Sequence, residues 1–335
     1  LFLLVLTFTI LFSKFSLWFD INSFYTNLLR DHEGQTFLKD YFCHFFPIQF
    51  YFFSPFLTFL NLNSFIILFS IILNFLFAFQ FAYYSKKILG DKFEFFSLFI
   101  IISFFFIPFG IGAAHHNELS IYFCTIGFLM AVSNINKFNY IALFYLIIGL
   151  TVKYSIAIPI FTAIFLSFSI LLFTNFKKQY LILFLKYIFL ISISFIVIIF
   201  IYTLNANINF QDFFSYLFLD TLSISRSRIT IGSFLFFDLF ENVFSFISDY
   251  SGIKNLPVGS ILQLPFIFGY IGFIYFIIAK RNSFSVNEKI YFYFLIFVTI
   301  FLFVSLGRNW NHKFIFFIIT NYLVLFYFIS LEKKI

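Results

Sequence analysis

Charged side chains are scarce in this chain of 335 residues, where Asp, Glu, Lys and Arg together make up 10%. A soluble domain carries roughly a quarter charged residues. With 62% hydrophobic residues and a mean hydropathy of +1.01, the composition excludes a water-soluble globular protein. The net charge of +7 is first a sign of the positive-inside bias of membrane proteins, so we expect no nucleic-acid partner.

Glycine, proline and cysteine are also few. Twelve Gly and six Pro leave little room for flexible linkers or disordered tails. The two cysteines, Cys43 and Cys124, cannot form a framework of several disulfides. We expect one outside the membrane and one within it, both as free thiols.

Apolar runs long enough to cross a bilayer recur along the chain. A spanning helix needs about 20 mostly apolar residues, and continuous runs without alternation favour helices over a barrel. The sequence predicts an all-α, polytopic integral membrane protein, one membrane domain over residues 1–335, with about ten transmembrane helices. The predicted spans are 1–19, 62–85, 95–113, 119–135, 138–152, 154–174, 180–203, 261–279, 290–306 and 313–330. The first is interpreted as a span because no cleavage motif of small residues follows Trp18 and Phe19.

Basic residues set the expected orientation. With a cytoplasmic N-terminus, the short inner loops collect the pairs Lys86–Lys87 and Lys177–Lys178, together with Lys137 and further lysines. All five histidines and most acidic residues then lie outside. We therefore expect a multi-pass protein of the bacterial cytoplasmic (inner) membrane, with any active site facing outward.

Two outer loops are long. In the first, residues 20–61, Ile21, Phe24, Tyr25, Leu28 and Leu29 follow the spacing of one helical face. This predicts an interfacial helix, stopped by Gly34, that rests on the membrane. The second loop, 204–260, carries another amphipathic stretch at 240–247.

Acidic and histidine side chains mark two candidate positions on the outer side. Asp20 follows the first span, where it can cap the next helix or act as a base. His116 and Glu118 interrupt the apolar runs at the second outer turn. They form either a polar turn at the interface or a group that positions an acceptor or binds a divalent metal.

Basic side chains mark the other candidates. Lys153 lies between two short apolar halves and either snorkels to the interface or faces an anion, because a lysine at mid-membrane costs about 2.5–3.5 kcal/mol. Arg308, His312 and Lys313 in the last outer turn suit a phosphate or a snorkelling belt around Trp310. Arg226 and Arg228 belong to a solvated loop or to a second phosphate site.

The order of these features resembles the GT-C-fold glycosyltransferases that use polyprenyl-phosphate sugars, including protein mannosyltransferases and the lipid A aminoarabinose transferase. The resemblance rests on the stretches 20–25 and 37–47 around Gly34, on the turn 116–118, on the step 149–154 and on the closing Trp310 to Lys313. It covers the first half of the chain and the last turn, whereas loop 204–260 has no counterpart.

The resemblance implies an enzyme of the cell envelope that moves a sugar from a polyprenyl-phosphate donor to a lipid, polysaccharide (such as lipopolysaccharide) or protein acceptor. Asp20 would be the general base. The residues that would bind substrate are Tyr25, Asp40, His44, His116, Glu118, Lys153, Arg308, His312 and Lys313. A divalent metal on His116 and Glu118 stays an open possibility. The alternatives are an O-antigen polymerase-like enzyme, with Arg226 and Arg228 in a late loop, and a flippase or transporter of lipid-linked sugars.

Overall fold

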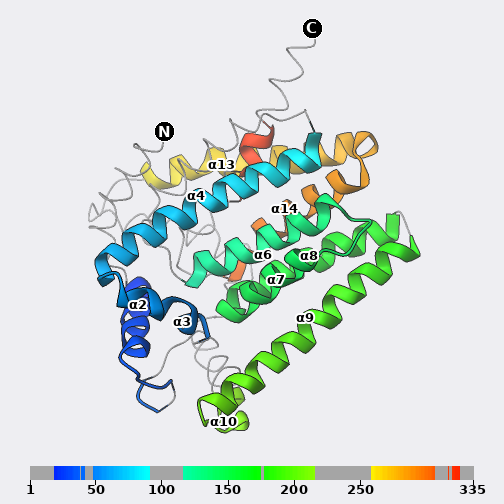
Figure 1. Ribbon diagram of the computed structural model, residues 1–335. Helices are drawn as coiled ribbons and strands as arrows, with labels where there is room; N and C mark the ends of the chain where they lie inside the picture. Colours follow the sequence, from blue (N-terminus) through cyan, green and yellow to red (C-terminus); the bar gives the residue numbers. More distant parts are fainter. Residues whose placement is uncertain are drawn as a thin grey trace.

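The structure is a computed structural model that describes residues 19–37, 39–41, 48–90, 116–174, 177–215, 258–305, 316 and 319–324. Its secondary structure in these ranges is helical, as predicted (Figure 1). The helices are α2 (Phe19–His32), α3 (Ile48–Phe53), the 3-10 helix η1 (Ser54–Thr58), α4 (Leu62–Leu89), α6 (His116–Ser133), α7 (Tyr140–Val152), α8 (Tyr154–Thr174), α9 (Lys178–Asn205), α10 (Phe210–Phe214), α13 (Val258–Lys280), the 3-10 helix η5 (Arg281–Ser283) and α14 (Val286–Ser305).

Three of the described helices, α4, α8 and α9, are long and apolar enough to cross a membrane. They indicate an integral membrane protein, but the prediction of ten crossings is wrong for the part of the chain that is described. The segment 138–152 yields α7, whose 13 residues rise only about 20 Å against a hydrocarbon core of about 30 Å. The predicted spans 119–135, 261–279 and 290–306 correspond to α6, α13 and α14, which are helical but are not among the three candidate membrane-crossing helices. Residues 1–18 of the first predicted span, all of 95–113 and most of 313–330 lie outside the described residues.

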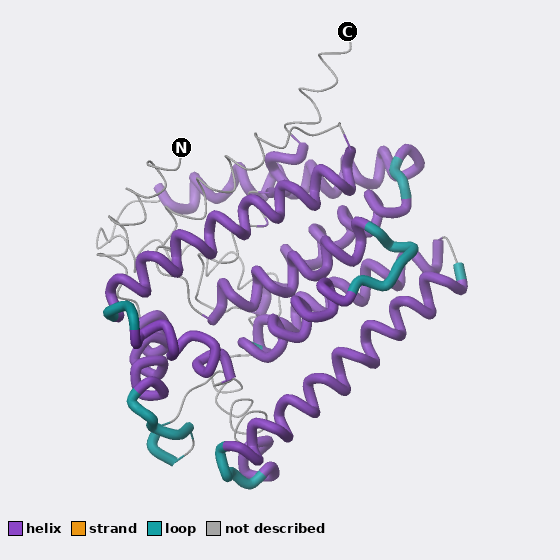
Figure 2. Tube along the Cα trace, viewed as in Figure 1, coloured by secondary structure: helices purple, strands orange, loops and turns teal. Residues whose placement is uncertain are grey.

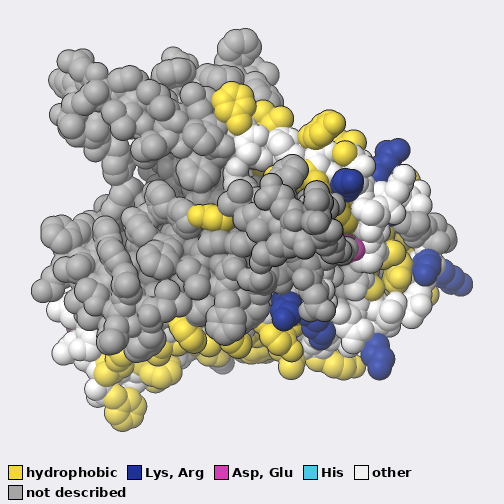
Figure 3. All heavy atoms as spheres, turned by 90° about the horizontal axis from the view of Figure 1, so that it is seen from above, with side chains coloured by type: hydrophobic (Ala, Val, Ile, Leu, Met, Phe, Trp, Pro, Cys, Tyr) yellow, Lys and Arg dark blue, Asp and Glu magenta, His cyan; other side chains and the backbone are white. Residues whose placement is uncertain are grey.

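The helices form a bundle with two different ends (Figure 2). At one, α2 and α3 lie beside the first turns of α4, α6 and α8, and we refer to it as the α2 end (Figure 1). The opposite end carries most of the described basic residues, and we refer to it as the lysine end. These are Lys86, Lys87, Lys137, Lys177, Lys178, Lys280, Arg281 and Lys289. The basic side chains visible in Figure 3 lie in its right-hand half, toward this end.

Side-chain caps explain where several helices begin and end. Asn61 accepts the N–H of Ser64 at 2.8 Å and starts α4, which ends at Gly90 with φ +68°. Ser285 and Glu288 form a capping box at the start of α14: each side chain accepts the other residue's N–H, at 2.6 Å for Ser285 N and 3.3 Å for Glu288 N.

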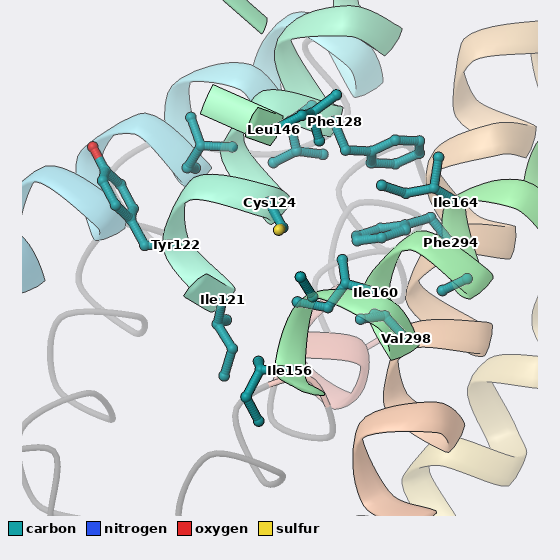
Figure 4. Packing of buried hydrophobic residues seen from close by; sticks show 14 of the residues in the cluster. Ile121, Tyr122, Cys124, Phe128, Leu146, Ile156, Ile160, Ile164, Phe294 and Val298 are labelled. Atoms are coloured by element: carbon teal, nitrogen blue, oxygen red, sulfur yellow. The ribbon is translucent and has the colours of Figure 1, made fainter. Parts of the chain in front are cut away.

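Helices α6 and α7 approach each other closely at the centre of the bundle. A Cβ on Gly149 of α7 would lie 2.8 Å from the backbone nitrogen of Cys124, and one on Gly127 would lie 3.0 Å from the carbonyl oxygen of Ala142. Small residues of this kind let membrane helices pack backbone to backbone. Cys124 is a buried free thiol, as predicted, and lies in the apolar interior with Leu146 (Figure 4). Cys43 lies outside the described residues.

Candidate functional site

Helix α2 confirms the amphipathic helix predicted for the first outer loop. It ends at His32, and Gly34 adopts φ +82°, which favours glycine. The predicted apolar face is buried at Phe24, Tyr25 and Leu28, but it packs on other helices of the protein. Asp20 lies in the first turn of this helix, at the α2 end of the bundle.

His116, Asn117 and Glu118 form the first turn of α6 and are almost completely buried, with exposed fractions of 1%, 1% and 3%. Of the two alternatives given for these residues, a polar turn exposed at the water interface does not agree with their burial. The cause is tertiary: α2 covers the end of α6, and the rings of Phe24 and His116 lie 5.9 Å apart. Two of the predicted site residues thus lie next to the helix that carries Asp20.

Lys153 occupies the break between α7 and α8, as its position between two apolar halves predicts. Its backbone is extended (φ −154°, ψ 96°), and its carbonyl oxygen accepts the N–H groups of Ile156 and Ala157 at 3.1 and 3.0 Å. The hydroxyl of Ser120 shares its one proton between this carbonyl oxygen, at 3.2 Å, and that of Gly149, at 2.9 Å. The half-buried Lys153 therefore lies one helical turn from the His116–Glu118 turn of α6.

Tyr25 and Asp40 have roles in the fold. Tyr25 is buried against Phe65. Burial raises the pKa of its hydroxyl, and a hydrogen bond with Ser70 of α4 opposes part of that rise. Asp40 is exposed and accepts the N–H of Thr36 at 2.6 Å, which closes a turn in the first loop.

A second group of polar residues, not predicted as a site, lies beside this loop. Asp31 is half-buried, and burial raises the pKa of its carboxyl, against the effects of a hydrogen bond with Ser54 and the charge of His32. Tyr51 lies near this carboxylate, and its ring centroid is 5.7 Å from that of Tyr202 in α9. No local pattern in the sequence joins these residues, because they come from four separate helices, α2, α3, η1 and α9.

Contacts with the end of α9 hold the first loop in place. The ammonium of Lys39 donates to the carbonyl oxygen of Ala206 at 2.9 Å. The buried ring of Phe37 lies 5.9 Å from that of Phe213 in α10. The first loop therefore packs against both α9 and α10 at the α2 end.

The described residues include no group of three His, Cys, Asp or Glu side chains placed to hold a metal ion. His116 and Glu118 supply two ligands at most, so a metal there would need a third from elsewhere in the chain. The predicted site residues His44, Arg308, His312 and Lys313 lie outside the described residues, as do Arg226, Arg228 and the stretch 240–247.

Comparisons with models of protein families, with curated proteins and with solved structures found no match.

Proposed function

We propose that the protein is a membrane glycosyltransferase that moves a sugar from a polyprenyl-phosphate donor to a lipid, polysaccharide or protein acceptor. The reaction takes place at the α2 end. The asymmetry of basic residues supports this orientation, because lysines collect on the cytoplasmic side of membrane proteins. The lysine end then faces the cytoplasm, and the α2 end faces the outside of the cytoplasmic membrane.

The position of Lys153 is the observation that carries the proposal. The 13 residues of α7 rise about 20 Å, so in a helix that starts at the cytoplasmic edge the break at Lys153 would lie about 10 Å short of the opposite edge of a 30 Å hydrocarbon core. A lysine at such a depth is costly unless it faces a cavity or an anion. The phosphate of a polyprenyl-phosphate donor is an anion at the lipid boundary, and its chain can remain in the bilayer.

The other residues have roles that follow from their chemistry. Asp20, in the first turn of α2, takes the proton of the acceptor hydroxyl as it attacks the sugar. The leaving lipid phosphate gains negative charge, which Lys153 stabilises together with Arg308, His312 and Lys313. His116 and Glu118 orient the acceptor, alone or through a metal that a third ligand completes.

The test incubates the purified full chain with a panel of labelled polyprenyl-phosphate sugars and measures released lipid phosphate. We expect lipid phosphate to be released from one donor, and we expect Asp20→Asn to abolish this release. Lys153→Met should raise the KM for that donor about tenfold or more, because a hydrogen bond to a charged group contributes about 1.5–3 kcal/mol. Lys178→Met, at the exposed start of α9, is the matched control and should leave the KM unchanged.

Three outcomes would contradict the proposal. Full activity of Asp20→Asn removes the general base, and an unchanged donor KM in Lys153→Met removes the phosphate site. Movement of the lipid-linked sugar across the bilayer without release of lipid phosphate would favour a flippase.

A further inference from the structure

Two buried amide side chains at the α2 end carry atoms that have no hydrogen-bond partner among the described residues. Gln49 of α3 and Asn117 of α6 are each 1% exposed. The unpartnered atoms are Nε2 and Oε1 of Gln49 and Oδ1 of Asn117. Buried polar groups are nearly always paired, so three such atoms at one end of a bundle require an explanation.

Both amides adjoin residues that pack on the same ring of α2. Gln49 precedes Phe50, whose ring centroid lies 5.7 Å from that of Phe24. Asn117 follows His116, whose ring centroid lies 5.9 Å from that of Phe24. Helix α3 also contacts α7, the helix that ends at Lys153. The two amides therefore belong to the region of the proposed reaction.

The unpartnered atoms indicate the chemistry of a ligand. The amide of Gln49 offers a donor and an acceptor on one planar group, and Oδ1 of Asn117 offers a further acceptor. Neighbouring hydroxyls of a sugar ring match this set, because each hydroxyl can donate one hydrogen bond and accept others. A phosphate or a lipid chain does not match it, since phosphate oxygens cannot satisfy the acceptors and a lipid chain satisfies neither kind of group.

We infer that Gln49 and Asn117 form a sugar-binding face at the α2 end, which hydrogen-bonds the ring hydroxyls of the transferred or accepting sugar. The inference deepens the proposed function and rests on it. Lys153 would bind the phosphate, and the two amides would bind the neutral ring beside it. Gln49 is not marked in the sequence, where it lies in an aromatic-rich segment, and Asn117 belongs to the turn 116–118 but is buried only in the folded chain.

The experiment uses the full chain in phospholipid nanodiscs and saturation-transfer NMR with methyl glycosides of glucose, mannose, galactose and N-acetylglucosamine. We expect at least one glycoside to bind, and Gln49→Leu and Asn117→Leu each to weaken its affinity about tenfold. Gln179→Leu, exposed at the lysine end, is the matched control and should not change the affinity. Binding of no glycoside, or equal affinity in all three variants, would overturn the inference.

Thermal unfolding without glycoside separates binding from a structural role. Leu replaces an unpartnered amide with an apolar group of similar size, so Gln49→Leu should keep or raise the melting temperature. A drop of several degrees would show that the amide holds the fold together, and would overturn the inference.

Competition assigns the sugar to donor or acceptor. Displacement of the glycoside by a polyprenyl-phosphate sugar but not by polyprenyl phosphate supports the donor sugar, and displacement by neither supports the acceptor. Displacement of the glycoside by polyprenyl phosphate itself would mean that the face binds phosphate, and would refute the inference of a sugar-binding face. A different result would contradict the proposed function but not the inference: glycosides bind and the two variants weaken that binding, while no polyprenyl-phosphate donor is consumed.

Discussion

Replacement of Gly149 by alanine tests the close approach of α6 and α7 that places Lys153. A Cβ at this position would lie 2.8 Å from the backbone nitrogen of Cys124 and 3.3 Å from Cβ of Phe123. Gly272 in α13 is a matched control, because a Cβ there meets nothing within 4 Å. Both glycines lie inside helices, so the same substitution has the same local effect at both sites.

The expected difference comes from the contacts alone. Alanine stabilises a helix interior by about 1 kcal/mol relative to glycine, while extra volume in a packed core costs about 1–3 kcal/mol. Gly272→Ala should therefore be neutral or stabilising by up to about 1 kcal/mol. Gly149→Ala should be about 1–3 kcal/mol less stable than Gly272→Ala, because backbone atoms of α6 can yield only if the helices separate.

Equilibrium unfolding in mixed micelles of a mild detergent and SDS, followed by circular dichroism, measures both variants. The carbonyl of Gly149 accepts from Ser120, which also donates to the carbonyl of Lys153. We therefore expect Gly149→Ala to impair donor turnover as well. Equal stability of the two variants would refute the close approach of the two backbones.

Three further predictions concern the outer loop, a helix cap and the topology. Burial raises the pKa of Asp31 in the folded state, so the free energy of unfolding should fall as the pH rises from the ordinary pKa of an aspartate through the raised pKa. Asp31→Asn should remove this pH dependence of the free energy of unfolding, and an unchanged dependence would contradict the prediction. Ser285→Ala should lose about 1 kcal/mol of stability with the capping box of α14, whereas Ser283→Ala, exposed in η5, should lose less. In a cysteine-free background, an impermeant thiol reagent should label a cysteine at exposed position 33 from outside but not one at exposed position 282, and the reverse pattern overturns the orientation.

Features that depend on neighbouring residues could be predicted from the sequence. The spacing correctly predicted burial of Phe24, Tyr25 and Leu28 on α2, although Leu29 of the same predicted face is exposed, and Gly34 marks the end of the helix. The apolar runs predicted α4, α8 and α9 to within a few residues at most ends, because length and hydropathy are local properties. The break at Lys153 follows from the same pattern.

Features that depend on distant segments could not be predicted. Asn27 is not one of the residues of the predicted apolar face of α2, yet it is buried, because other helices surround α2 on more than one side. His116 and Glu118 have the composition of an interfacial turn, and only the packing of α2 over α6 buries them. The segment 138–152 was predicted to span the bilayer, but its helix α7 has 13 residues, about seven too few to cross. An apolar window of 15 residues does not reveal where the helix within it begins.

The short α7 and the lysine at its end have a common explanation. A longer apolar helix would span the core, and an apolar residue at position 153 would avoid the cost of a cation at that depth. Neither feature is needed to join α7 to α8, since a turn at the membrane surface would serve. In the proposed orientation they would place this lysine about 10 Å below the outer boundary, where Ser120 of α6, one helical turn after His116, hydrogen-bonds its backbone carbonyl oxygen. A soluble anion would have to leave water to reach that depth, whereas the phosphate of a lipid is already held at the edge of the hydrocarbon, and this difference favours a lipid-linked substrate over a soluble one.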